Sequence, residues 1–254
     1  MDLDLEGKVA LVTGGSRGIG FAIAEALLKE GAVVAFTARQ QDGIDTAQGQ
    51  LSPFGDVTGH QVDSSDTDAV GSWVEAQAAH YGKLDIIISN TSAGGGVDMG
   101  LEGWKQSLDT DILGTVALLE AALPHLEKSQ GAIVQIATIT ATEHHDFPGN
   151  ASYGAVKAAL IRYMARIAKD YGAKQVRANT VSPGPIYIEN GVWQWVKENM
   201  GEYYERDVAA HPQSRMGNAA EVADAALFLA SDRARWITGQ NICVDGGFTQ
   251  KIHF

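Results

Sequence analysis

The chain has 254 residues, of which 45% are hydrophobic and 20% are charged, a balance typical of a globular protein and unlike that of a disordered or fibrous one. With 19 lysines and arginines against 31 aspartates and glutamates, the formal net charge is −12, which repels nucleic acids and anionic membrane surfaces, so we expect neither as a partner. No apolar run approaches the roughly 20 residues of a membrane span and no signal-peptide pattern opens the chain, so we expect a single cytoplasmic domain over residues 1–254.

Short apolar runs alternate with longer segments of helical periodicity through most of the chain. The runs of strand length cover residues 9–13, 33–37, 58–62, 84–89, 132–137, 176–182 and 241–245. The helical segments cover residues 18–29, 66–81, 102–128, 152–171 and 219–231. We expect three of these helices to be closed by glycine, at Gly31, Gly82 and Gly172. The alternation predicts an α/β protein with a doubly wound, seven-stranded parallel sheet flanked by helices, the Rossmann fold.

The alternation lapses between residues 186 and 217. This segment carries four aromatic residues, Trp193, Trp195, Tyr203 and Tyr204. We predict that it forms a small, partly helical lid over the carboxyl ends of the strands, where an open sheet binds ligands. The aromatic rings could enclose a hydrophobic or aromatic substrate, or they could pack the lid itself, and the sequence leaves both open.

A glycine-rich stretch, TGGSRGIG at residues 13–20, follows the first strand and opens the first helix. Glycine at these positions lets the backbone turn tightly and approach a pyrophosphate, which the N-terminus of the helix attracts. Because the stretch lies in the first strand-to-helix unit of a parallel sheet, it predicts a dinucleotide site. The predicted contact residues are Gly14, Ser16, Arg17, Gly18, Ile19 and Gly20.

The end of the second strand indicates which dinucleotide binds. An acidic residue there would hold the ribose hydroxyl of NAD, whereas this chain has Arg39, with no carboxylate before Asp42. Arg17 in the glycine loop can reach the same 2′-phosphate. Two arginines facing a dianion predict NADP(H), although both could instead be solvated surface residues.

Tyr153 and Lys157 are four residues apart on a predicted helix and therefore share one face. An ammonium group beside a phenol favours the phenolate and lowers the phenol pKa, which suits proton exchange with an alcohol. Taken alone, the spacing is also common on structural helices.

Several motifs in addition to the glycine loop and this pair complete a known pattern. They are Asp63, LDIIISN (84–90), YGAVK (153–157), RANTVSPGPI (177–186), SRMGNAAEVADAALFLAS (214–231) and ITGQNICVDGG (237–247). Together they resemble the short-chain dehydrogenases/reductases in their compact form, especially the branch similar to 3-oxoacyl-acyl-carrier-protein reductase. The resemblance covers nearly the whole chain. It implies an oxidoreductase that interconverts a carbonyl and a secondary alcohol.

The resemblance also implies roles for individual residues. Tyr153 would be the acid and base, and Lys157 would bind the nicotinamide ribose and lower the pKa of the tyrosine. Asp63 would bind the adenine amino group, and Asn90 would line the adenosine ribose. The residues expected beside the nicotinamide are Pro183, Gly184 and Ile186.

The chain departs from the family at two catalytic positions. The usual serine is replaced by threonine, either Thr138, which the strand end favours, or Thr140, which fits the usual spacing to Tyr153. Asp111 stands where the family usually has an asparagine that supports a proton relay from the lysine. The change either adds a charge near Lys157 and alters the relay, or leaves Asp111 as a residue that caps or kinks its helix.

Two changes affect residues expected near the cofactor. The segment 89–92 reads Ser-Asn-Thr-Ser instead of the usual Asn-Asn-Ala-Gly, and Ile188 replaces a threonine that often contacts the carboxamide. We therefore expect the cofactor pose to differ in detail.

A metal site and a reactive thiol are both disfavoured. His144, His145 and Asp146 are adjacent in a loop, but neighbouring histidines do not readily chelate one ion and no third ligand has suitable spacing, so we expect no metal. Cys243 lies in an apolar run and is expected to be a packed core thiol.

Surplus apolar residues on two long helices suggest subunit contacts, and the resemblance implies a homotetramer. These residues are Leu113, Val116, Leu119, Leu160, Tyr163 and Ile167. The expected substrate is a small free carbonyl compound, because a carrier-bound 3-oxoacyl thioester would favour a basic docking surface whereas the lid carries Glu189, Glu198, Glu202 and Glu205. The thioester remains an alternative, as does a regulatory or structural subunit that binds NADPH without turnover.

Overall fold

The computed structural model has one parallel sheet of seven strands, and the structure describes residues 2–94, 100–144 and 151–250. The strands are β1 (Val9–Val12), β2 (Val33–Ala38), β3 (Val57–Gln61), β4 (Ile86–Ser89), β5 (Ala132–Ile136), β6 (Arg177–Pro183) and β7 (Asn241–Val244). They lie in the order β3-β2-β1-β4-β5-β6-β7, and each neighbouring pair is parallel. The predicted fold class is confirmed, with strand ends displaced by at most two residues.

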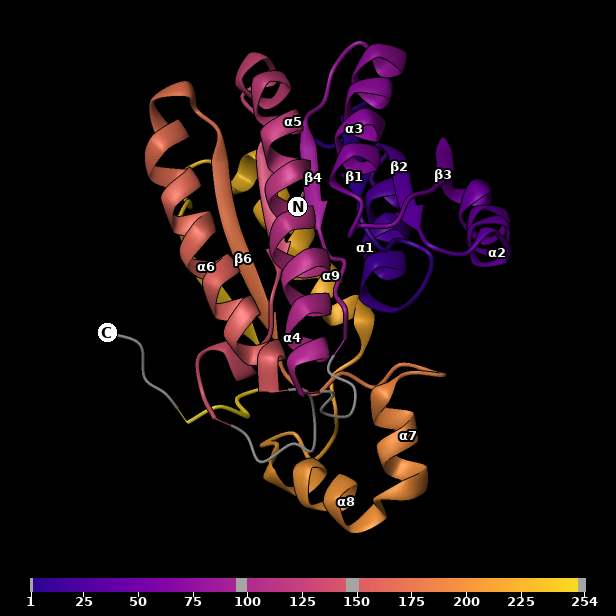
Figure 1. Cartoon of the computed structure of the whole chain (residues 1–254), viewed down its shortest axis with the longest axis vertical. Coiled ribbons are helices and arrows are strands. Elements are labelled where there is room, and N and C mark those ends of the chain that lie inside the picture. Colours follow the sequence, from indigo (N-terminus) through magenta and orange to yellow (C-terminus); the bar gives the residue numbers. More distant parts are fainter. Residues whose placement is uncertain (1, 95–99, 145–150, 251–254) are drawn as a thin grey trace.

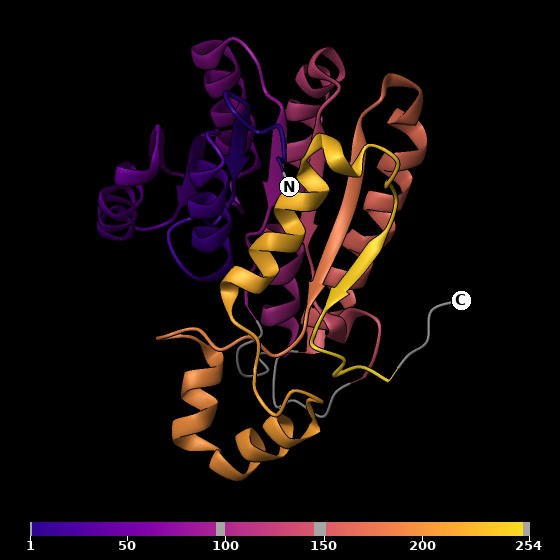
Figure 2. The same cartoon turned by 180° about the vertical axis from the view of Figure 1, so that it is seen from behind.

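Helices cover both faces of the sheet (Figures 1 and 2). The helices of the described residues are α1 (Gly18–Lys29), α2 (Gln41–Leu51), α3 (Thr67–Tyr81), α4 (Gly100–Ser107), α5 (Gly114–Ser129), α6 (Ala151–Tyr171), α7 (Val192–Asn199), α8 (Gly201–Ala210) and α9 (Ala219–Ala230), of which α7 and α8 lie beyond the edge of the sheet. One buried cluster joins the sheet to α1, α2 and α9, and another joins its opposite face to α3, α5 and α6.

Strand β1 and the first three residues of β4 are apolar at every position because both faces of these strands are covered. Leu11 and Ile87 point toward α3, α5 and α6, whereas their neighbours Val12 and Ile88 point toward α1 and α9, and all four are fully buried. This is why the sequence shows short continuous apolar runs instead of an alternating pattern.

The predicted set of helices needs two corrections. The predicted helix 102–128 is divided into α4 and α5 by a π-helical turn at Leu108–Leu113. The helix α2 was not predicted, because its apolar stripe is only Ile44, Ala47 and Leu51 and two glycines interrupt its sequence.

Gly31 and Gly82 have the positive φ expected at a helix end, with values of 82° and 74°. Gly172 instead begins a short 3₁₀ turn, and the left-handed residue after α6 is Gln175. The chain thus continues one further tight turn before β6.

Two predictions about burial were wrong. Cys243 is only partly buried, because β7 is the last strand of the sheet and has no neighbour on its outer side. Of the apolar residues assigned to subunit contacts, Leu119, Leu160 and Ile167 are buried within the chain itself. Their periodicity reflects packing against the sheet.

The carboxyl ends of the strands open toward α7 and α8, which lie beyond that edge of the sheet in both views (Figures 1 and 2). The strand order reverses direction between β1 and β4, and such a switch point leaves a crevice between the loops that follow the two strands. In the part of the chain that the structure describes, no helix is both long enough and apolar enough to cross a membrane.

Candidate active site

The glycine loop leads directly from β1 into α1. Gly14 and Gly18 have φ values of 67° and 61°, a region that residues with a side chain rarely adopt. A Cβ atom at Gly20 would lie 2.2 Å from the carbonyl oxygen of Gly14, so this position has no room for a side chain. Arg17 precedes α1 with extended backbone and no side-chain cap, which leaves the first-turn amides of the helix without a capping side chain.

Asn90, at the end of β4, holds this loop in place. Its side-chain amide donates to the carbonyl oxygens of Thr13 at 3.0 Å and Gly14 at 3.1 Å. In return, the Thr13 hydroxyl oxygen accepts from the backbone amides of Asn90 and Thr91. This bracing role cannot be predicted from the sequence pattern, because it depends on β1 and β4 being adjacent in the sheet.

Three charged residues predicted to contact the cofactor lie in the segments that follow β1, β2 and β3. Arg17 and Arg39 are exposed, and Asp63 follows β3. One carboxylate oxygen of Asp63 accepts from the backbone amide and the hydroxyl of Ser65. These bonds, helped by the charge of Arg39, lower the pKa of Asp63 and keep it ionised.

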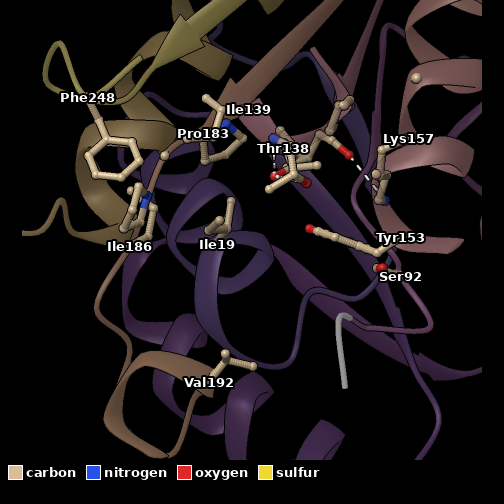
Figure 3. Close-up of a pocket in the computed structure, with 18 of the residues that line it drawn as sticks. Ile19, Ser92, Thr138, Ile139, Tyr153, Lys157, Pro183, Ile186, Val192 and Phe248 are labelled. Atoms are coloured by element: carbon tan, nitrogen blue, oxygen red, sulfur yellow. Dashed lines mark hydrogen bonds between the residues drawn. The ribbon is translucent and has the colours of Figure 1, made fainter. Parts of the chain in front are cut away.

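Tyr153 and Lys157 occupy one face of the first turns of α6 and line the same cavity (Figure 3). The phenol of Tyr153 points toward Thr138 at the end of β5 and is hydrogen-bonded to it. The Thr138 hydroxyl also contacts the Thr140 hydroxyl, with 3.1 Å between the oxygens. Thr138 is therefore the threonine in contact with Tyr153, and the Thr140 hydroxyl contacts the Thr138 hydroxyl.

Lys157 forms a buried ion pair with Asp111 of the π-helical turn. The distance from Nζ to Oδ1 is 3.0 Å, and the two side chains are 2% and 1% exposed. Lys157 Nζ also donates to the carbonyl oxygens of Thr91 and Ile136, each at 3.3 Å. The second carboxylate oxygen of Asp111 accepts from the backbone amide of Ala93 at 2.8 Å.

The pKa expected for the Tyr153 phenol needs correction. Burial raises the pKa of Tyr153 to about 12, the negative charge of Asp111 adds to the increase, and the hydrogen bond from Thr138 opposes it. The expected lowering of this pKa was wrong, because the phenol is removed from water and the negative charge of Asp111 opposes its ionisation.

The cavity beside Tyr153 has a volume of about 730 Å³. Its wall is mostly apolar and aromatic, and the residues that form this part are Ile19, Ile139, Ile186, Val192, Trp193, Tyr203 and Phe248. Pro183 and Gly184, expected beside the nicotinamide, line it as well. His144 and Asp207 contribute polar groups.

The four aromatic residues of the segment 186–217 divide into two pairs. Trp193 and Tyr203 line the cavity, with their ring centres 6.3 Å apart. Trp195 is 51% exposed, and Tyr204 packs against the ring of Tyr187. Trp193 and Tyr203 therefore face the cavity, Tyr204 packs within the segment itself, and Trp195 is largely exposed.

The loop after β5 carries the two adjacent histidines for which a metal site was considered. His144 lines the cavity, whereas His145 and Asp146 lie outside the described residues. Among residues 2–94, 100–144 and 151–250, no three His, Cys, Asp or Glu side chains are grouped so that they could hold a metal ion.

Known proteins are similar to this chain over nearly its whole length. A family model described as enoyl-(acyl carrier protein) reductase matches residues 14–249. Isoepoxydon dehydrogenase patN of Penicillium expansum is 34% identical, over 96% of this chain and 95% of its own. The 3-oxoacyl-[acyl-carrier-protein] reductase FabG of Escherichia coli is 32% identical, over 96% of this chain and 98% of its own.

A solved structure has the same fold over nearly the whole chain. The L-sorbose reductase of Gluconobacter frateurii, in complex with NADPH and L-sorbose, superposes with a TM-score of 0.90. It is 30% identical, and the match covers 99% of this chain and all of that one. The similarity therefore extends through the glycine loop, the Tyr153 region and the segment 186–217.

Proposed function

Because this chain belongs to the short-chain dehydrogenase/reductase family of oxidoreductases, we propose that it uses NADP(H) to interconvert a small hydrophobic or aromatic ketone and its secondary alcohol. One observation carries the proposal. The side chains of Tyr153, Thr138 and Lys157 line the same cavity, beside the glycine loop. An acid, a hydroxyl donor and a cation beside an apolar cavity are the groups that a carbonyl reduction needs.

The glycine loop fits a dinucleotide. A Cβ atom would strain the backbone at Gly14 and Gly18 and would clash with the loop at Gly20. The first-turn amides of α1 can bind a pyrophosphate. Near this loop, the hydroxyl of Thr91 is buried and has no hydrogen-bond partner among the described residues, which suits a ribose hydroxyl. The nicotinamide half would be held by the cavity residues Lys157, Pro183, Gly184 and Ile186.

The choice of NADP(H) over NAD(H) rests on Arg17 and Arg39. Both are exposed beside the glycine loop and at the end of β2, where they can pair with a 2′-phosphate, and no carboxylate occupies this strand end. The similar L-sorbose reductase binds NADPH. We expect kcat/KM to be at least about tenfold higher with NADPH than with NADH, and an advantage for NADH would refute the assignment.

Tyr153 is the proton donor in this proposal. The cofactor supplies a hydride to the carbonyl carbon when it is bound. Tyr153 gives its phenolic proton to the carbonyl oxygen, and the Thr138 hydroxyl holds that oxygen by a hydrogen bond. The contact between these two side chains brings both donors to one point at the end of β5.

The cavity wall supports an apolar substrate. Trp193, Tyr203 and Phe248 offer flat surfaces for a ring or an alkyl chain. The resemblance to FabG keeps a 3-oxoacyl thioester as the second candidate. Against it, four glutamates of the lid segment are exposed, so this surface is acidic rather than basic; they are Glu189, Glu198, Glu202 and Glu205.

A substrate panel tests the proposal. NADPH oxidation would be followed spectrophotometrically with aryl ketones, diketones, quinones, steroids and 3-oxoacyl thioesters, with the Tyr153→Phe variant as control. Turnover that the variant loses would support the reductase and identify its substrate class. NADPH binding without turnover on any member would instead favour a non-catalytic subunit.

We also propose a homotetramer. Leu101, Trp104 and Leu108 follow one face of α4 and the π-helical turn and are 73%, 37% and 45% exposed. On the other side of the sheet, Trp236 and Ile242 beside the edge strand β7 are 97% and 38% exposed. Two separate apolar surfaces suit an assembly with two kinds of contact. Sedimentation at micromolar concentration checks it, and a monomer would contradict it.

A further inference from the structure

The ion pair between Lys157 and Asp111 changes what the lysine can do for the tyrosine. An ammonium group has three N–H donors, and Lys157 has three acceptors around it in the described structure: Asp111 Oδ1 at 3.0 Å and the carbonyl oxygens of Thr91 and Ile136 at 3.3 Å. A hydroxyl of a bound ligand could replace one of the two carbonyl oxygens. The charge of Lys157 would still be matched by Asp111.

The position of Asp111 is fixed by the fold. The π-helical turn brings its carboxylate inward, and the backbone amide of Ala93 donates to its second oxygen at 2.8 Å. Both members of the pair are almost fully buried, so water does not screen their charges. The negative charge of Asp111 therefore opposes the positive charge that Lys157 presents to the Tyr153 phenol.

The other titratable groups around the phenol do not replace the lost positive charge. His144, Tyr203 and Asp207 are the further titratable residues of the cavity wall, and Asp207 is itself paired with the exposed Arg206. Among the described residues of the wall, Lys157 is the one lysine or arginine, and Asp111 offsets its charge.

We propose that Asp111 is a positioning residue that offsets the charge of Lys157 and thereby sets Tyr153 to donate a proton to a carbonyl oxygen rather than to accept one from an alcohol. The inference rests on the proposed function. It adds that the enzyme favours reduction of the carbonyl over oxidation of the alcohol at neutral pH. The raised pKa of Tyr153 agrees with it. In the step, the phenolic O–H bond breaks, the π electrons of the carbonyl form the new O–H bond, and the carbon gains the hydride from reduced nicotinamide. The phenolate then recovers a proton from water.

Tyrosinate difference spectroscopy on the protein without cofactor tests this without any turnover. The near-ultraviolet tyrosinate absorbance of wild type minus Tyr153→Phe isolates the ionisation of Tyr153. We expect no signal up to about pH 10, where an ordinary tyrosine is half ionised. The same subtraction in an Asp111→Asn background should show the tyrosinate at a pH lower by about one unit or more, a tenfold change in acid constant.

Asp109→Asn is the matched control, because Asp109 is exposed on the same π-helical turn. It should leave the titration of Tyr153 unchanged. Asp111→Ser is a second variant with room for a water molecule beside Lys157, and circular dichroism verifies that each variant is folded at each pH.

Two results would overturn the proposal. One is a wild-type signal from Tyr153 well below pH 10, and the other is a titration that neither folded Asp111 variant moves. The proposed function fails separately, if Tyr153→Phe keeps its turnover. With an active enzyme, Asp111→Asn should also move the alkaline loss of ketone reduction to lower pH and raise alcohol oxidation near neutral pH, which Asp109→Asn should not do.

Discussion

The side-chain amide of Asn90 donates to the carbonyl oxygen of Gly14 at 3.1 Å and thereby ties the end of β4 to the glycine loop. We expect Asn90→Ala to leave the carbonyl oxygens of Thr13 and Gly14 without this donor. The loss should be about 1–3 kcal/mol of unfolding free energy and a weaker NADPH affinity. Urea unfolding and a fluorescence titration measure both.

Asn199→Ala is the control for Asn90→Ala. The Asn199 amide makes one hydrogen bond to the Trp195 carbonyl at the exposed end of α7. This variant should keep its NADPH affinity, and equal effects from the two variants would argue against a specific brace.

Gly20→Ala should abolish cofactor binding. The added Cβ atom would lie 2.2 Å from the Gly14 carbonyl oxygen and 2.5 Å from the Asn90 amide nitrogen, so the loop must move. We expect NADPH affinity to fall by at least about tenfold. Gly71→Ala makes the same change inside α3, where no atom lies within 4 Å of the added Cβ, and should stabilise the protein by about 0.5–1 kcal/mol. If Gly20→Ala still bound NADPH with wild-type affinity, the absence of room at Gly20 would not matter for cofactor binding, contrary to the proposal.

The two threonines after β5 should differ in their effect on turnover. Thr138→Val removes the hydroxyl that contacts Tyr153 while nearly keeping the side-chain shape, and we expect kcat to fall by about 100-fold. Thr140→Val removes the second hydroxyl of the chain and should reduce kcat much less. Steady-state kinetics on both variants checks the order, and a reversed order would assign the substrate oxygen to Thr140.

The raised pKa of Tyr153 predicts a loss of stability at alkaline pH. Between the ordinary tyrosine pKa of 10.0 and the folded value of about 12, the unfolded chain releases this proton while the folded chain keeps it. The folded state therefore binds more protons in this window, and the free energy of unfolding falls as the pH rises through it. The contribution is intact below about pH 10 and amounts to roughly 3 kcal/mol when it is fully lost.

Tyr153→Phe has no such proton to lose. Its urea unfolding curve should lose less free energy than that of wild type between about pH 9 and the highest pH at which both are folded. Parallel losses in the two proteins would contradict the raised pKa.

Trp193 and Trp195 provide a matched pair on one helix. Trp193 lines the cavity, whereas Trp195 is 51% exposed and is not one of the lining residues. Trp193→Ala should raise KM for an aromatic ketone by about tenfold or more, since a buried ring contact is lost, and Trp195→Ala should leave it unchanged. Similar KM values for both variants would mean that the substrate does not contact the wall formed by α7.

Much of this protein is already determined by its sequence, because the relevant signals are local. The glycine loop needs positive φ at Gly14 and Gly18, and apolar runs such as β1 and β4 can be buried on both faces only within a parallel sheet covered by helices. The spacing of Tyr153 and Lys157 places them on one helix face wherever that helix lies.

The tertiary structure decided the electrostatics of the site. Asp111 meets Lys157 only because the π-helical turn and α6 pack together, and the three acceptors around the lysine come from three separate segments. Likewise, Thr138 and not Thr140 contacts the phenol, and Trp193 and not Trp195 faces the cavity. A sequence pattern gives the chemistry of each group, but the charge state of a buried group depends on which distant groups the fold places around it.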